Sequence, residues 1–179
     1  AGGWRVGYFA VPDSLIEIFE KLAVLGTETF SAVSAPSQFA AITAYSDDHS
    51  TYLEKVKKVL HVISHYVYEQ LKLINVEMIE PEGGFYLMPD FTKLLSHKFK
   101  NSKVFCKTLL DETGVAVLPG SDFGFSQDKL IFRLSYVDFD GSKFLEANNE
   151  EIIEKNLNKF APKIVDGVQQ IINFTKKYK

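Results

Sequence analysis

The sequence predicts an α/β protein in which a short mixed segment and an α+β unit are joined by one long helix. An apolar stripe with helical spacing runs from Leu53 to Ile74. Short apolar runs bounded by proline or glycine lie on both sides of it and are typical of buried strands. Helical spacing returns after Asn149. We therefore expect three parts: residues 1–48, a linking helix over 49–75, and an α+β unit over 76–179.

The first part combines one expected strand with two expected helices. The run Val6–Val11 is apolar and ends at Pro12, which predicts a buried strand. Asp13 or Ser14 can cap the first helix, and the second follows the hydroxyl-rich stretch 29–37. A segment this short cannot bury the apolar faces of all three elements. We expect those faces to lack packing partners within the chain.

The linking helix is expected to begin after the polar break Asp47–Ser50. Its apolar residues follow one another at intervals of three and four, which places them on one face over about six turns. They are Leu53, Val56, Leu60, Ile63, Val67, Leu71 and Ile74. A helix this long is typical of a connection between two substructures.

The α+β unit is expected to alternate short strands with helices. The expected strands are residues 76–79, 85–88, 115–118 and 130–136. The pair Gly83 and Gly84 predicts a turn or bulge between the first two. Ser102 can cap a helix that runs through Thr113 and ends at Gly114. In the helical tail, Pro162 breaks or restarts the helix.

Composition and charge exclude several classes of partner. The chain has 179 residues and a net charge of −3, which argues against nucleic acid or an anionic membrane as the main partner. No apolar run approaches the ~20 residues that span a bilayer. Cys106 is the only cysteine, so no internal disulfide can form. This fits a reducing compartment, and we expect a cytoplasmic protein.

The sequence does not predict a metal site. His61 and His65 lie four residues apart, which is the spacing of a helical metal pair. No further cysteine, histidine or paired carboxylate nearby completes a set of ligands. Cys106 has no activating partner in the sequence, so we expect a packed helical thiol.

Two arginines are candidates for binding an anion. Arg5 follows two glycines and Trp4, and a guanidinium binds phosphate oxygens through a planar fork; a surface arginine ahead of a strand is the alternative. Arg133 interrupts an apolar run, and strand alternation places it on the face opposite Phe132. Such an arginine must be exposed at a sheet edge or be paired. At the rim of a site it can bind a carboxylate.

Four short motifs occur in a fixed order along the chain. They are Gly3–Tyr8 (GWRVGY), Pro81–Tyr86 (PEGGFY), Val117–Gly124 (VLPGSDFG) and Phe132–Ser135 (FRLS). In this order they resemble the class I and II aminotransferases of the aspartate aminotransferase kind, which are fold type I enzymes dependent on pyridoxal 5′-phosphate. The resemblance covers essentially the whole chain. It implies the C-terminal part of that fold: the end of the large domain, the linking helix and the small α+β domain.

The resemblance also implies roles for three residues. Arg5 would bind the phosphate of the cofactor, Arg133 would bind the α-carboxylate of the substrate, and Phe85 would lie near the substrate. The parent protein would be a homodimer that transfers an amino group between an L-amino acid and a 2-oxo acid.

One part of the family pattern is missing from the sequence. In the family the Schiff-base lysine precedes the position of Arg5, which puts it just upstream of Ala1, and no lysine of this chain matches it. The opening Ala1-Gly2-Gly3 has no polar leader. We expect that the chain begins inside a domain, holds no catalytic residue and is inactive alone.

Two alternatives to a transaminase remain open. The same scaffold can carry a lyase, synthase or decarboxylase, because a fold does not fix the reaction. The missing lysine also allows a non-catalytic interaction module, although the motifs that are present are those of a site.

Overall fold

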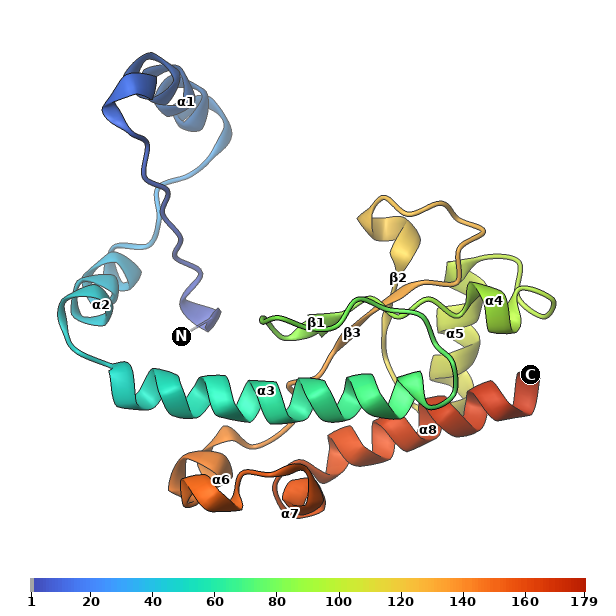
Figure 1. Cartoon of the computed structure of the whole chain (residues 1–179). Helices are drawn as coiled ribbons and strands as arrows, with labels where there is room; N and C mark the ends of the chain where they lie inside the picture. The colour runs from blue at the N-terminus through green and yellow to red at the C-terminus, as the bar shows by residue number, and fades with distance from the viewer. Residues whose placement is uncertain (1) are drawn as a thin grey trace. The chain divides into compact units, whose positions relative to one another are not determined.

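The computed structural model describes residues 2–179 and divides into two units (Figure 1). One unit ends at Ser50 and the other runs from Thr51 to Lys179. The expectation that concerns Ala1 lies outside the described residues. The assignment of the three predicted parts to domains of a larger enzyme stays a prediction. Within residues 2–179, no helix is both long enough and apolar enough to cross a bilayer.

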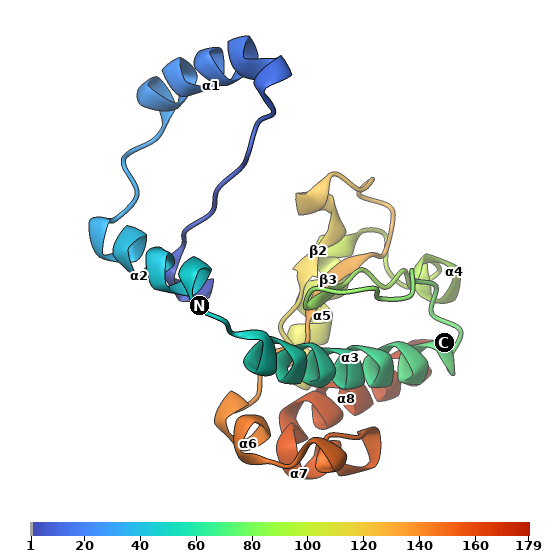
Figure 2. The same ribbon diagram turned by 60° about the vertical axis from the view of Figure 1, so that its left-hand side comes forward.

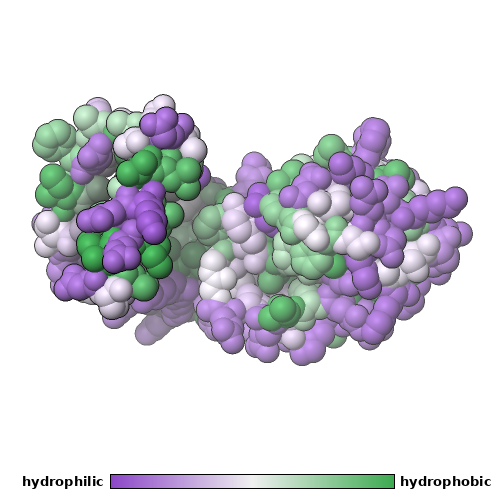
Figure 3. All heavy atoms as spheres, turned by 90° about the horizontal axis from the view of Figure 1, so that it is seen from above, coloured by the Kyte–Doolittle hydropathy of each residue, from purple (hydrophilic) through white to green (hydrophobic). Residues whose placement is uncertain are grey.

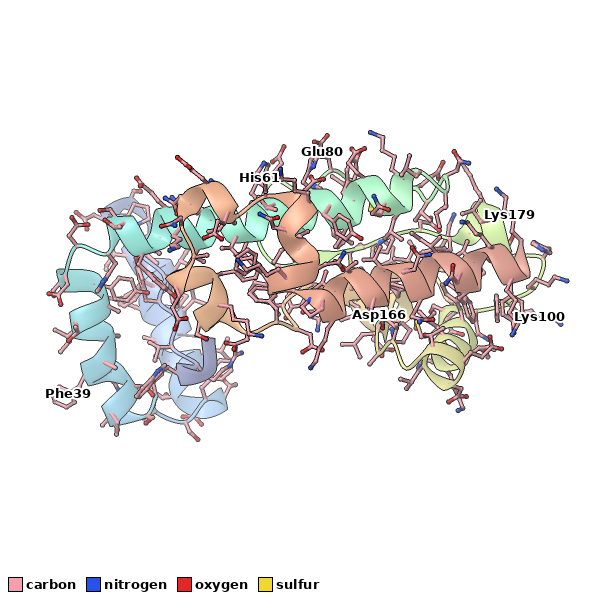
Figure 4. All side chains as sticks on the ribbon, turned by 90° about the horizontal axis from the view of Figure 1, so that it is seen from below. Phe39, His61, Glu80, Lys100, Asp166 and Lys179 are labelled. Carbon is pink, nitrogen blue, oxygen red and sulfur yellow. The ribbon has the colours of Figure 1, made fainter. Side chains whose placement is uncertain are left out.

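The first unit has helices but no core. Its elements are two short 3-10 turns, η1 (Gly2–Trp4) and η2 (Asp13–Leu15), and the helices α1 (Ile16–Thr29) and α2 (Ala35–Ser46). No side chain of α1 is buried, and Ser37 is the only buried one of α2. Apolar side chains gather on the surface of this unit (Figure 3), and Phe39 points away from α2 with 73% of its area exposed (Figure 4). The predicted lack of packing partners for the two helices is confirmed.

The predicted strand over residues 6–11 is wrong. These residues are irregular, because no strand among the described residues of this unit lies beside them to pair with their backbone. Tyr8 and Phe9 instead contact helix side chains, with ring centroids 5.1 Å from Tyr45 and 6.4 Å from Phe19. The predicted caps are wrong as well: no side chain caps α1, and η2 leads into it.

The long helix α3 spans Ser50–Lys72, and the predicted helix is confirmed. Its buried apolar side chains lie from its middle to its C-terminal end and are Val59, Ile63, Val67 and Leu71. Leu53, at the start of the predicted stripe, is 48% exposed. Figures 1 and 2 show that α8 (Pro162–Tyr178) runs alongside the C-terminal half of α3, where Ile63, Val67 and Leu71 are buried. Pro162 lies in the first turn of α8, so the proline starts this helix.

The second unit contains a three-stranded antiparallel sheet with the order β1-β3-β2. The strands are β1 (Tyr86–Leu87), β2 (Leu118–Pro119) and β3 (Phe132–Ser135). All three lie within or beside predicted strands and are shorter than predicted. The predicted strand at 76–79 is wrong, because only Glu77 forms an isolated bridge, to Asp90.

Short helices and turns complete the second unit. They are α4 (Thr92–Leu95), α5 (Ser102–Thr113), η3 (Gly120–Phe123), α6 (Gly141–Glu146), η4 (Asn149–Glu151), η5 (Glu154–Asn156) and α7 (Leu157–Phe160). The predicted end of α5 at Thr113 is confirmed, and Gly114 after it has a left-handed backbone. Its cap is Asn101, whose side chain accepts from the Val104 N–H at 2.9 Å, and not Ser102, which is buried.

One hydrophobic core fills the second unit between α3, α8, α5 and the inner face of the sheet. Aromatic rings form its centre. The ring centroid of Phe91 lies 5.1 Å from that of Phe132 and 5.4 Å from that of Phe105. Tyr136 is 1% exposed, and its hydroxyl donates to the Gly84 carbonyl at 3.0 Å. This bond ties the turn before β1 to the end of β3.

Candidate functional site

The candidate site is the solvent-facing side of the small sheet. Residues paired across antiparallel strands share a face, and the register pairs Tyr86 with Ser135 and Leu118 with Arg133. These four side chains are exposed or half-buried, whereas those that alternate with them along β3, Phe132 and Leu134, are buried. The predicted separation of Arg133 from Phe132 is therefore confirmed.

Arg133 occupies neither of the two positions expected for it. It lies on β3, the central strand, and not at a sheet edge. No carboxylate of residues 2–179 forms an ion pair with it. Two aromatic rings accompany the guanidinium instead, with its Cζ 4.2 Å from the centroid of Tyr86 and 4.5 Å from that of Phe123.

The segment that carries Phe123 is shaped by a close backbone approach. The Gly120 N–H donates to the Ile131 carbonyl at 2.8 Å, and a Cβ on Gly120 would lie 2.9 Å from that same oxygen. Only glycine fits there without a shift of the backbone. Ile131 itself is buried, with 6% of its area exposed. Gly124, with φ of 86°, then ends η3.

Phe85 lies beside this cluster. It is 42% exposed, and its ring centroid is 4.4 Å from that of Tyr86. The preceding Gly84 has φ of 76°, a conformation that favours glycine. The structure thus brings Phe85 and Arg133 together through Tyr86. No role was predicted for Tyr86 or Phe123 from the sequence, although both lie inside the motifs named above. An aromatic residue in each of these two motifs, together with the arginine on the strand at 130–136, was the signal that could have found them.

The charges of the second unit leave the arginine open to an external anion. The sequence has 20 lysines and arginines in total, of which Arg5 and Arg133 are the arginines. Every ion pair among residues 2–179 uses a lysine or a histidine as its cation. A half-buried guanidinium without a carboxylate partner is suited to bind one from a ligand.

Arg5 lies in the first unit, whereas Arg133 and Phe85 lie in the second. It is exposed, and its φ of 54° is uncommon for a residue other than glycine. Such backbone conformations cluster at functional sites. The permanent charge and exposure of Arg5 make it available to a phosphate.

The remaining reactive side chains have structural explanations. His65 Nδ1 lies 2.6 Å from Glu154 Oε1, and this hydrogen bond raises the pKa of the histidine. Within residues 2–179 no group of three potential ligands is placed to hold a metal ion. Burial, with a smaller contribution from Asp122, raises the pKa of Cys106 to about 12, which keeps the thiol protonated and unreactive.

Comparison with known proteins gives a consistent result. The family model described as aminotransferase class I and II matches residues 1–143. The chain is 35% identical over 124 residues to an aspartate aminotransferase of Bacillus sp. (strain YM-2), covering 68% of this chain and 31% of that protein. It is 34% identical over 136 residues to the aspartate aminotransferase of Bacillus subtilis, covering 75% of this chain and 33% of that protein.

A solved structure extends the similarity over nearly the whole chain. The crystal structure of aspartate aminotransferase from Thermotoga maritima matches with a TM-score of 0.62 and 25% identity, over 97% of this chain and 36% of that one. The chain therefore spans about a third of the length of the relatives that it matches.

Proposed function

This chain belongs to the class I and II aminotransferases, and on that premise we propose that the complete protein transfers an amino group between an L-amino acid and a 2-oxo acid. The observation that carries the proposal is the half-buried Arg133 on the solvent-facing side of the sheet, without a carboxylate partner among residues 2–179. Both substrates of a transaminase carry an α-carboxylate. One arginine can bind either of them in turn.

Arg133 is the proposed substrate clamp. Its planar guanidinium can hold both oxygens of a carboxylate through two parallel hydrogen bonds, which fixes the direction of the rest of the substrate. Holding the reacting carbon in one place contributes to the rate by orientation. Phe85 is the proposed neighbour of the substrate, which agrees with its exposed ring beside Tyr86.

The proposed cofactor is pyridoxal 5′-phosphate. When bound, it supplies an electron sink for the chemistry at the α-carbon. Arg5 fits the phosphate end of this group, because it is exposed, is permanently charged and has no ion-pair partner among residues 2–179. Arg5 and Arg133 would thus bind two different anions.

The domain assignment and the assembly follow from family membership. We assign residues 1–48 to a larger cofactor-binding domain, 49–75 to the linking helix and 76–179 to the small domain; the division after Ser50 supports this assignment. A homodimer is the proposed assembly. We propose a cytoplasmic location, which the single, buried cysteine supports, since free thiols persist in reducing compartments.

The proposal is tested by the need for an amino acceptor. The full-length enzyme with cofactor is assayed with a panel of amino acids in the presence and absence of a 2-oxo acid. We expect product only when both are present. Product formed without any 2-oxo acid would identify a lyase, synthase or decarboxylase on the same scaffold.

The Arg133→Lys variant tests the clamp within the same assay. Lysine keeps the positive charge but loses the two-pronged geometry. Charged hydrogen bonds of this kind are worth about 1.5–3 kcal/mol, so kcat/KM should fall by about 10- to 150-fold for the amino acid and for the 2-oxo acid alike. Lys129→Arg, an exposed change near β3, is the control and should leave both values unchanged.

A further inference from the structure

We propose that Tyr86 and Phe123 are positioning residues: their rings hold the guanidinium of Arg133 so that its N–H donors face an incoming carboxylate. This inference rests on the proposed role of Arg133 as the substrate clamp. The motifs place Tyr86 and Phe123 near the site, but only the geometry gives them a task.

Both rings lie close enough to Arg133 to hold its guanidinium. The Cζ of Arg133 lies 4.2 Å and 4.5 Å from the two ring centroids, well within the ~6 Å reach of a cation–π interaction. Tyr86 belongs to β1 and Phe123 to the turn after β2, so the two rings come from the two segments that flank β3. Arg133 is therefore held from both neighbours of its own strand.

Rings that lie against the face of a guanidinium leave its hydrogen-bond donors free. Its hydrogen bonds lie in its plane, whereas an aromatic ring interacts with its flat face. A ring that stacks on the group consequently restricts its orientation without using its donors. In the ion pairs of this chain, such as Lys163 with Asp138, a carboxylate instead accepts from the donors of the cation. The donors of Arg133 are restricted by the rings and remain available.

The surrounding backbone holds both rings in place, which a positioning residue requires. Phe123 ends a turn that is fixed by the Gly120–Ile131 contact, and Tyr86 lies in β1 directly after the turn that Tyr136 binds through Gly84. Both rings are nonetheless 41–42% exposed, so they contribute little to the core. Their role is at the surface around Arg133.

The loop offers a matched control. Phe125 is 42% exposed and lies two residues after Phe123, and no cation–π contact joins it to Arg133 within the described part of the chain. Phe123→Leu and Phe125→Leu therefore remove the same ring from the same loop. Only the first change removes a contact with the guanidinium.

The experiment uses the full-length enzyme with cofactor and compares Tyr86→Leu, Phe123→Leu and Phe125→Leu. A partly desolvated cation–π contact corresponds to about a 5- to 30-fold change in affinity. We expect KM for the amino acid and for the 2-oxo acid to rise by that factor in the first two variants, with a smaller loss in kcat. Phe125→Leu should leave KM unchanged. Equal effects of Phe123→Leu and Phe125→Leu would overturn the proposal.

A graded substitution separates the electrostatic role of the ring from its volume. Phenylalanines with one, two and three fluorine atoms at position 123 weaken the ring's attraction for a cation while nearly keeping its shape. We expect the logarithm of KM to rise with each fluorine for substrates with an α-carboxylate. Inhibition by an alkyl amine without a carboxylate should stay constant along the series. A flat series for the carboxylate substrates would contradict the proposal.

A second readout does not depend on activity. Rings stacked on a guanidinium shift the NMR signal of its Nε–H, and the Arg133 signal can be assigned by its loss in Arg133→Lys. We expect the shift to disappear in Phe123→Leu and to persist in Phe125→Leu. An enzyme that shows this shift but no transamination would refute the proposed function and leave the ring contacts standing. A signal that is unaffected by Phe123→Leu would refute the ring contacts themselves.

Discussion

Both units of the chain form regular helices, but the units differ in the contacts that stabilise those helices. The first unit forms two regular helices whose apolar side chains remain exposed, with Ser37 as its only buried side chain among the described residues. The second unit closes one core between α3, α5, α8 and a sheet of only three short strands. The comparison teaches that local sequence preference is enough to form a helix here, whereas a strand and a core need partners distant in sequence.

The largest test of this contrast compares two phenylalanines. Phe132→Ala removes a fully buried ring from the core and should lower the free energy of unfolding by about 3–5 kcal/mol. Phe39→Ala removes a ring that is 73% exposed and should change it by less than about 0.5 kcal/mol. Urea unfolding of the 179-residue chain measures both. A comparable cost for the two variants would mean that the first unit has a core of its own.

A smaller effect is expected from two glycines of the second unit. Gly120→Ala forces a Cβ to within 2.9 Å of the Ile131 carbonyl and should cost about 1–3 kcal/mol. Gly167→Ala in α8 meets no atom within 4 Å and should stabilise by about 0.5–1 kcal/mol, because alanine favours a helix. Thermal unfolding of both variants shows whether each change raises or lowers the stability. If Gly120→Ala also stabilises, the close approach does not constrain the turn.

Tyr136→Phe tests how firmly the second unit holds the turn before its site. The change removes the hydroxyl that donates to the Gly84 carbonyl and should cost about 1 kcal/mol. Hydrogen exchange of the amides at positions 83–86 should accelerate. Exchange of the α8 amides should accelerate only as much as the small loss in the free energy of unfolding of the whole unit requires. Uniform acceleration throughout the unit would assign the effect to core packing instead.

The smallest expected effect is the pH dependence of one surface pair. The hydrogen bond to Glu154 raises the pKa of His65 above its usual 6.5. A raised pKa in the folded state means that the stabilisation is present below 6.5 and is lost as the pH rises through the raised value. Both side chains are nearly half exposed, so the contribution should stay below about 1 kcal/mol. Urea midpoints between pH 5 and 8 should fall with pH in the wild type and less in His65→Gln.

The accuracy of sequence-based prediction follows the same division. The long helix is found from apolar residues at intervals of three and four, and the end of α5 is found from the glycine that follows it. Both are local signals in the sequence. The strand at residues 6–11 was predicted from its apolar composition alone and is wrong, because composition does not provide a pairing partner. The strands at 115–118 and 130–136 are shortened for a related reason: their ends leave the three-stranded ladder.

The candidate site shows a similar limit. Alternation along β3 correctly separates Arg133 from Phe132, because the period of a strand is a local property. The position of Arg133 on the central strand depends on strand order, which no local pattern contains. Its contacts with Tyr86 and Phe123 join residues from three segments, and the sequence offers only the motifs in which they lie. Arg5, Phe85 and Arg133 as ligand-binding residues stay predictions.

The alternation along β3 links the stability of the sheet to the direction in which Arg133 points. A slip of one residue in strand pairing would turn Arg133 toward the core and Phe132 toward water, so that a misregistered chain would lose stability and the outward position of Arg133 together. The outward position of Arg133 therefore depends on the same strand pairing that buries Phe132 and Leu134.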